Sequence, residues 1–175
     1  MAVTQPIKLD ASTDLYRGQL FVFCDDLPIA FASTAQMEVS TETIDASSKM
    51  TGAWGVSIPG KKSFTLSSEA LYTKKEGAMS YDTLLAAQCA DKLLDFKFGE
   101  ATVTEQDAWG GKFEAPEDGT CFSGKVMITA LSLQSENGQL AKVSVSLTGV
   151  GALVMPTAAT EPPSGGGGTG GDGEL

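Results

Sequence analysis

Histidine is entirely absent from this chain. Its absence removes the commonest general base and metal ligand, together with every Ser-His or Cys-His nucleophile system. The three cysteines, Cys24, Cys89 and Cys121, are too few and too widely spaced for a disulfide framework or a zinc cluster. We therefore expect buried free thiols, no metal, no cofactor and no catalytic residues, so the protein is not expected to be an enzyme.

Long apolar runs and basic clusters are also missing. No run approaches the length of a membrane span, and the first residues lack the basic and apolar regions of a secretory signal, so we expect a protein made in a cytoplasm. The net charge is −10 and the pI is near 4.3, which provides no basic footprint for gripping nucleic acid. The 175 residues, 42% of them hydrophobic, are typical of a globular protein with a core.

The composition divides the chain into three parts. Residues 1–17 are mixed and weakly periodic, which predicts an N-terminal arm with little regular structure. Residues 18–155 carry the strand-like patterns and are predicted to form one β domain. Residues 156–175 are rich in glycine, proline and threonine, so they cannot bury enough apolar surface to offset their ordering entropy and are expected to be a disordered tail.

Two alternating segments dominate the β domain. Residues 36–44 and 63–72 alternate apolar and polar side chains, which predicts two strands with one face on a core. The segment between them, 45–62, is far longer than a hairpin turn requires, and long loops in compact domains are often functional. It displays apolar side chains that a solvated loop has no reason to carry, so we expect a projecting arm that docks on another copy of the chain through Met50, Trp54, Val56, Ile58 and Pro59.

Further strands are predicted over residues 18–24, 93–99, 122–133 and 142–149, and another short strand over 29–32 is left open. The apolar phase of 122–133 shifts near Ala130, which predicts a bulge or bend. Residues 100–120 contain six acidic residues whose spacing does not match a calcium-binding loop, so we expect a solvated loop there.

One helix is predicted over residues 80–90. Ser80 is a suitable N-cap, and Asp82 lies in the first turn, where the helix dipole favours a carboxylate. The helix is expected to lie on a sheet through an apolar stripe at helical spacing, formed by Tyr81, Leu84, Leu85 and Cys89.

Five segments together resemble the tail tube (major tail) protein of long-tailed bacteriophages. They are residues 27–32, 42–49, Trp54 with 58–64, 81–84, and 145–153, which ends in Thr-Gly-Val-Gly-Ala-Leu. The resemblance runs from about residue 20 to residue 153, and the order of the segments carries it rather than any single motif. It does not extend to residues 100–120 or to the glycine-rich tail.

The resemblance implies a mainly β fold: a two-sheet sandwich or barrel with one flanking α-helix and a long projecting hairpin loop, an architecture that the type VI secretion tube protein shares. It also implies hexameric rings that stack into a hollow tube in the virion tail, assembled in the cytoplasm of a host bacterium. The implied partners are other copies of the chain, the tape measure, terminator and tail tip proteins, and DNA that passes through the lumen without specific binding.

An acidic chain suits such a channel, because phosphates do not adhere to an acidic wall. Glu38 and Glu42 are predicted to share one face of their strand, and Glu69 joins them on the partner strand. We expect these three carboxylates to line the lumen, while an outward solvated face is the alternative. Replacing Trp54 with alanine is expected to weaken assembly without unfolding the monomer.

Three other functions remain open at this stage. The first is a monomeric β-sandwich adhesion or binding module, in which the Trp54 arm recognises another ligand and the protein does not self-associate. The second is a tail terminator or baseplate ring component, which forms one ring but does not stack without limit. The third, an acid–base enzyme, requires two carboxylates that converge in a pocket.

Overall fold

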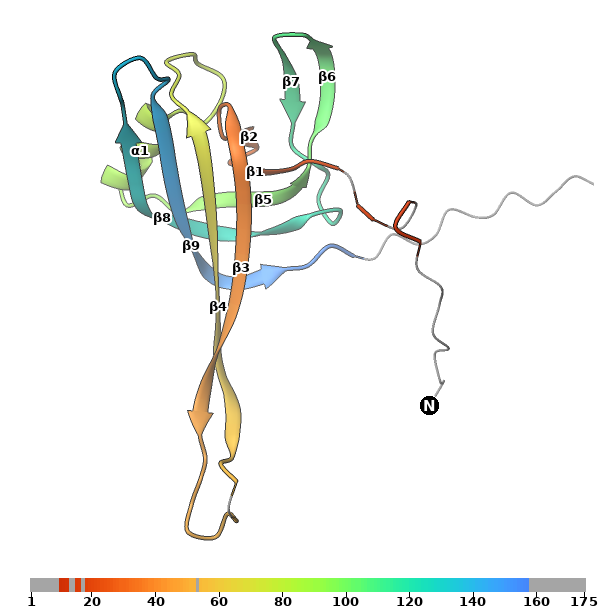
Figure 1. Ribbon diagram of the computed structural model, residues 1–175, viewed down its shortest axis with the longest axis vertical. Coiled ribbons are helices and arrows are strands. Elements are labelled where there is room, and N and C mark those ends of the chain that lie inside the picture. Colours follow the sequence, from red (N-terminus) through yellow and green to blue (C-terminus); the bar gives the residue numbers. More distant parts are fainter. Residues whose placement is uncertain (1–9, 13–14, 17, 53, 158–175) are drawn as a thin grey trace, which may run out of the picture.

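A computed structural model describes residues 10–12, 15–16, 18–52 and 54–157 (Figure 1). Most of the predicted N-terminal arm and of the predicted glycine-rich tail lies outside these residues, and the three-part division of the chain stays a prediction. The elements follow in the order β1 (Leu20–Cys24), β2 (Leu27–Pro28), β3 (Ala32–Asp45), β4 (Ser57–Leu71), α1 (Tyr81–Cys89), β5 (Leu94–Glu100), β6 (Thr102–Asp107), β7 (Gly110–Glu114), β8 (Phe122–Gln134) and β9 (Lys142–Val154).

Seven strands form one antiparallel sheet in the order β2-β1-β5-β8-β9-β4-β3, and β6 and β7 form a second, two-stranded sheet. The large sheet bends so that β5 packs across β4, where the rings of Phe64 and Phe96 lie 5.5 Å apart. The packing is therefore that of a sandwich, and the sheet does not close into a barrel. The prediction of a mainly β protein with two sheets and one helix is confirmed.

The core occupies the inside of this bend. Alternate residues of β4 from Phe64 to Ala70 are buried, and β9 buries Val143, Val145 and Leu147 in the same way. Strands β1, β5 and β8 supply the opposing side chains, among them Val22, Phe96 and Val126. The period-2 pattern of the sequence is therefore the pattern of burial.

Strand β8 contains the predicted irregularity. Its pairing with β9 shifts register between Ile128 and Ala130, which is a β-bulge at the position where the apolar phase changes. Before the bulge β8 pairs with both β5 and β9, whereas after it β8 pairs with β9 alone. The bulge thus lies just beyond the point where β8 stops pairing with β5.

The predicted helix is confirmed as α1, but its apolar stripe is only partly correct. Ser80 occupies the N-cap position without a side-chain capping hydrogen bond, and Leu84 is fully buried. Tyr81 is half-buried, whereas Leu85 and Cys89 are exposed. The helix lies at the edge of a small core, so the core covers only part of its apolar stripe.

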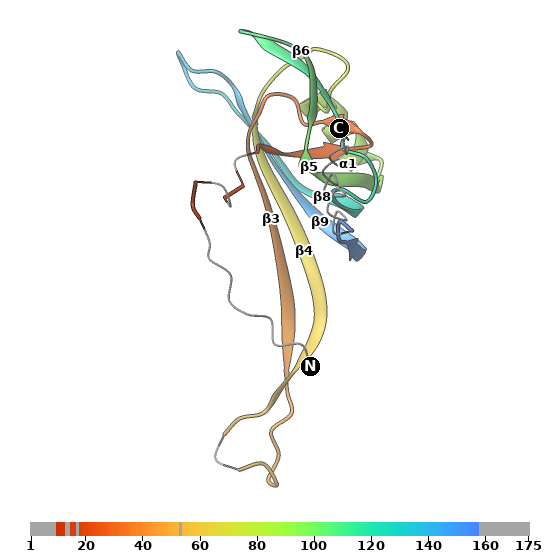
Figure 2. The same ribbon diagram turned by 90° about the vertical axis from the view of Figure 1, so that its right-hand side faces the viewer.

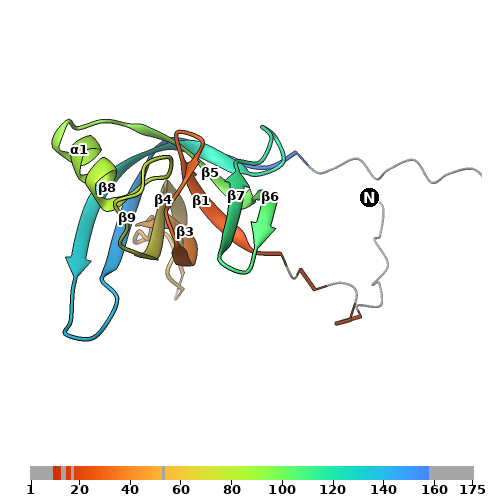
Figure 3. The same ribbon diagram turned by 90° about the horizontal axis from the view of Figure 1, so that it is seen from above.

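The prediction of a loop over residues 100–120 is wrong, because much of this segment forms the β6–β7 hairpin. Val103 pairs with Phe113 on the two strands, and the Asp107 carboxylate accepts hydrogen bonds from the backbone N–H groups of Trp109 and Gly110 in the turn. The hairpin stands beside β1, on the side of the molecule away from α1 (Figure 3). Both faces of the hairpin are largely exposed, so its strands carry polar and charged residues on both sides. They therefore lack the alternation of apolar and polar residues from which a strand is predicted.

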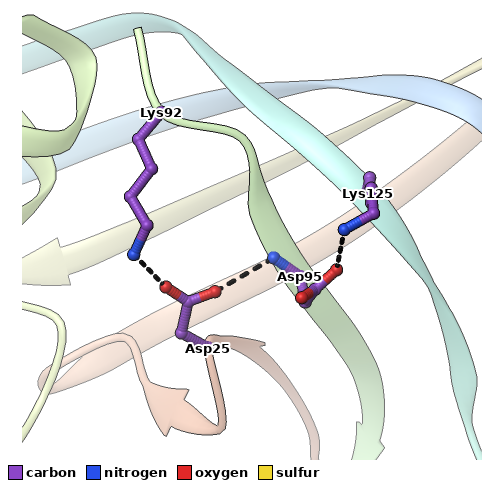
Figure 4. A network of polar contacts seen from close by, with 4 residues as sticks. All are labelled: Asp25, Lys92, Asp95 and Lys125. Atoms are coloured by element: carbon purple, nitrogen blue, oxygen red, sulfur yellow. Dashed lines mark hydrogen bonds and ion pairs between the residues drawn. The ribbon is translucent and has the colours of Figure 1, made fainter. Parts of the chain in front are cut away.

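A polar network joins the β1–β2 turn to the start of β5 and to β8 (Figure 4). Lys92 Nζ lies 2.6 Å from the Asp25 carboxylate, which also accepts a hydrogen bond from the Asp95 N–H at 3.0 Å. Asp95 in turn pairs with Lys125 at 2.9 Å. The hydrogen bond from Lys92 holds the pKa of Asp25 below its usual value, so this contact stabilises the fold above about pH 4 and is lost as the pH falls through the lowered pKa.

The cysteines differ from the prediction of three buried thiols, because Cys24 and Cys121 are buried but Cys89 is exposed at the end of α1. Burial raises the pKa of Cys24 to about 12, with a further contribution from Asp25, and burial also raises the pKa of Cys121. Since the thiolate is the reactive form, we expect one thiol to react with a disulfide reagent within minutes at pH 8, and the other two only in denaturant. Cys89→Ser should remove the fast phase, and two fast thiols would contradict this assignment.

Within the described residues, none of the helices has the length and apolar composition needed to cross a bilayer. The same part of the chain contains no group of three or more Cys, Asp or Glu side chains placed to hold a metal ion.

Candidate assembly surfaces

The β3–β4 hairpin extends beyond the core as a two-stranded arm (Figures 1 and 2). Strand β4 pairs with β9 only from Thr65 to Leu71, whereas its pairing with β3 continues to the Asp45–Ser57 pair. None of the described side chains between residues 38 and 63 is buried. Because an isolated two-stranded hairpin is marginally stable in water, the arm has most to gain from packing on another surface.

The loop at the end of this arm is shorter than the predicted segment 45–62. The strands pair through Thr43 with Pro59 and Ile44 with Ile58, so only residues 46–56 lie between them. Proline is compatible with β4 at this point because the strand has no neighbour on its other side. The sequence Pro-Gly-Lys-Lys suggested a loop because its strand character depends on pairing with β3.

The five residues predicted to contact another subunit all lie on the arm and are all exposed. Met50 and Trp54 occupy the tip, with exposed fractions of 97% and 87%. Val56 ends the loop, while Ile58 and Pro59 belong to β4 rather than to the loop. The structure thus presents two large apolar side chains at the far end, one where the loop ends and two on β4, and their role in subunit contacts stays a prediction.

Hydrogen bonds order the tip. The Ser47 N–H donates to the Asp45 carboxylate at 2.8 Å, and the Ser47 hydroxyl accepts from the Val56 N–H at 3.0 Å. The side-chain and backbone hydrogen bonds from Ser47 lower the pKa of Asp45. A turn in which the Thr51 N–H donates to the Ser48 carbonyl at 3.0 Å continues this order. A preorganised loop loses less conformational entropy on binding.

The face of β3, β4, β9 and β8 that points away from the core carries mainly polar side chains, with Met127 of β8 exposed opposite Thr148. Figure 2 shows α1 and β5 on the opposite side of β3 and β4. The register aligns hydroxyl side chains in rows across the strands, as in Ser67 with Ser146 and Thr65 with Thr148. Ser40 and Ser63 confirm the alignment, since their hydroxyls lie 2.8 Å apart. We call this surface the hydroxyl face.

Glu38, Glu42 and Glu69 lie on the hydroxyl face. Glu69 pairs with Thr34 and Glu38 with Thr65, and all four residues alternate with the core-facing positions of their strands. Strand alternation places Glu42 on the side of Glu38, next to the bulge between Thr41 and Thr43. The three carboxylates are spread along the ribbon rather than clustered, and their exposure to a lumen stays a prediction.

A second surface, which no sequence pattern predicted, lies at the end of the molecule opposite the arm tip. A cleft of about 800 Å³ lies between the β6–β7 hairpin, residues 73–78 and residues 28–32; we call it the upper cleft. Its wall includes Phe31 and Trp109, with exposed fractions of 60% and 93%. The sequence signal for this surface is Trp109, a tryptophan between an acidic residue and two glycines in a segment that was predicted to be a solvated loop.

Solved structures similar to this fold come from a tail, a virion and a tail tube. The tail of an empty gene transfer agent (GTA) particle with C6 symmetry matches with a TM-score of 0.59 and 16% identity over 79% of this chain and 96% of the other. The virion of a native GTA particle matches with a TM-score of 0.58 and 15% identity, over 79% and 95% of the chains. The SPP1 tail tube matches with a TM-score of 0.52 and 13% identity, over 75% and 73%.

At identities this low, the similar structures show the fold alone. The family is shown by the match of the sequence to a family profile. The comparison with curated proteins found no match to this sequence. The sequence profile described as phage tail tube protein matches residues 27–155, a span that contains the arm, the helix and the hydroxyl face. Since this match covers well over half of the chain, the protein belongs to the phage tail tube protein family.

Proposed function

We propose that this structural tail tube subunit forms hexameric rings that stack into a hollow channel for DNA. The observation that carries the proposal is the arm: a hairpin with no buried described side chain between residues 38 and 63 that presents Trp54 and Met50 on an ordered tip. Such a segment suits an interface, where large apolar anchors provide most of the binding energy. The C6 symmetry of a similar tail supports the ring size.

The hydroxyl face is proposed to line the channel. It carries Glu38, Glu42 and Glu69 among serine and threonine side chains, with Lys142 at its end. Hydroxyl groups offer DNA only weak neutral hydrogen bonds, and the carboxylates repel phosphates. A wall of this composition permits transit without adhesion.

The remaining roles follow from a place in the tail. The chain is proposed to act without catalysis, to reside in the virion tail after assembly in the bacterial cytoplasm, and to meet the tape measure inside the tube, the tail tip at one end and the terminator at the other. The extended arm supports stacking rather than a single ring, because its tip lies far from the body of its own subunit (Figure 1).

Negative-stain electron microscopy of the purified protein across a concentration series tests this function. Rings or hollow tubes, formed alone or after addition of purified tail tips, are the expected result. Single rings that never stack would indicate a terminator-like or baseplate-like role. Uniform monomers under both conditions would contradict the proposal and favour an adhesion module.

The lumen assignment has its own test. The triple variant Glu38→Lys, Glu42→Lys, Glu69→Lys is expected to assemble but to retain short DNA when tubes are sedimented at low salt, because lysines in the wall bind phosphates. Retention should fall steeply as salt rises. The control reverses an equal charge at three exposed positions off this face, Asp91, Glu117 and Glu136. Equal DNA retention by both variants would place the carboxylates outside the lumen.

A further inference from the structure

The upper cleft combines exposed aromatic side chains with a rigid frame. Phe31 has a backbone φ of 50°, a conformation that is unfavourable for a bulky residue and that typically persists where function requires it. The ring of Phe113 lies 5.3 Å from that of Phe21, which fixes β7 against β1. Lys97 on β5 pairs with Asp118 at 2.9 Å and so anchors the segment that follows the hairpin.

The charge of the cleft is negative. Glu76, Glu105 and Asp107 line it together with Lys75 and Lys112, and Lys112 is already paired with Glu114 at 3.0 Å. The carboxylate of Asp107 is engaged by the turn of its own hairpin. Glu76 and Glu105 therefore remain as exposed carboxylates beside the aromatic wall. This surface suits a ligand that is apolar and basic together.

The arm tip has that composition. Residues 46–56, the loop at the tip, carry Lys49 and no acidic residue, so the rest of the chain holds a net charge of −11 (−10 minus +1), and Lys61 and Lys62 follow on β4. Lys49 directly precedes Met50 in the loop that also carries Trp54. The basic tip of an acidic protein thus also presents two large apolar side chains, Met50 and Trp54, with exposed fractions of 97% and 87%.

The two surfaces lie at opposite ends of the long axis, with the arm tip at the bottom and the β6–β7 hairpin at the top of Figures 1 and 2. A subunit cannot fill its own cleft with its own tip. Complementary surfaces at opposite ends produce head-to-tail contacts, which extend without limit unless a rotation closes them. This is the geometry that successive rings of a tube require.

We propose that the upper cleft receives the arm tip of a second copy from the adjacent ring, with Trp54 against Phe31 and Trp109 and with Lys49 beside Glu76 and Glu105. The proposal rests on the tube function and adds the acceptor surface for the arm. It also accounts for the strained, exposed Phe31, because the ring becomes buried in the assembled tube.

Phe31→Asn separates docking from folding. Asparagine tolerates positive φ better than phenylalanine, so the monomer should keep or gain thermal stability, whereas the cleft loses an aromatic wall. We expect the critical concentration for tube assembly to rise about ten-fold or more, measured by sedimentation. Leu93→Asn, at an exposed apolar position outside the cleft, is the matched control and should leave that concentration unchanged.

A cross-link identifies the occupant. In a Cys89→Ser background, Met50→Cys with Trp109→Cys is expected to give a ladder of disulfide-linked oligomers when tubes are oxidised, because each copy links to the next. Neither single cysteine variant should produce a ladder beyond a dimer. A ladder obtained with Leu175→Cys in place of Met50→Cys would assign the cleft to the C-terminal segment and overturn the proposal.

The outcomes of these experiments distinguish failure of the docking proposal from failure of the proposed tube function. Normal tubes from Phe31→Asn, together with no ladder from the paired cysteines, would overturn the docking site while leaving the tube function intact. Failure of the unmodified protein to form any ring or tube, even with tail tips, would contradict both. Loss of monomer stability in Phe31→Asn would show that the ring supports the fold instead of docking.

Discussion

Replacing Trp54 with alanine is expected to raise the concentration needed for tube assembly by at least about thirty-fold, with no change in the unfolding temperature of the monomer. The side chain is 87% exposed, so its removal costs the isolated subunit no core packing. In an interface, truncation of a buried tryptophan typically costs about 2 kcal/mol or more, which corresponds to that factor. Sedimentation and thermal unfolding monitored by circular dichroism provide the two measurements.

The control for this variant is Leu85→Ala, which truncates an exposed apolar side chain on α1 and should alter neither quantity. A Trp54→Ala monomer that unfolds at a markedly lower temperature would show that the tip packs on its own subunit. Unchanged assembly with an unchanged monomer would remove Trp54 from the interface and leave Met50 as the principal side chain at the tip.

The second large effect is expected inside the core. Gly149 lies in β9 opposite Val126, and a Cβ at this position would fall well within contact distance of the Phe64 ring. Phe64 cannot withdraw easily, because it is buried and packs against Phe96. Gly149→Ala should therefore lower the free energy of unfolding by about 1–3 kcal/mol, as overpacking of a core usually does.

For a chain of this length such a loss lowers the unfolding temperature by about 2–12 °C. Phe64→Leu in the Gly149→Ala background should recover part of the loss, giving a coupling free energy of about 0.5 kcal/mol or more in the double-mutant cycle. Gly52→Ala is the matched control, because no atom lies within 4 Å of its Cβ position. Equal effects at the two glycines would exclude the clash with Phe64.

The local pattern of apolar and polar residues predicted those strands in which buried and exposed positions alternate. The alternation from Phe64 to Ala70 identified β4, and the apolar phase shift near Ala130 located the bulge of β8. Cys89 was expected to be buried on the apolar stripe of α1 but is exposed, because the core beneath the helix covers Leu84 fully and Tyr81 only in part. Helical spacing specifies a face and cannot specify how much of it will be covered.

The exposure of most of the candidate assembly residues could also be predicted from the sequence. All five arm residues and all three carboxylates are exposed on the β3–β4 ribbon. The loop boundaries were not, because Ile58 and Pro59 become strand only through pairing with β3. The upper cleft was missed entirely. Its walls come from residues 28–32, 73–78 and the β6–β7 hairpin, which no local pattern connects.

By itself the sequence determined the acidic charge, the absence of histidine chemistry, the alternating strands and an apolar, basic segment between two of them. These are properties of composition and of the two-residue period of a strand. Tertiary structure decided that β1 pairs with β5, that the sheet bends into a sandwich, and that the arm tip and the aromatic cleft lie at opposite ends. Those features depend on pairing between strands that are far apart in the sequence. Every strand offers the same backbone N–H and C=O groups, so its own sequence does not specify which strand will satisfy them.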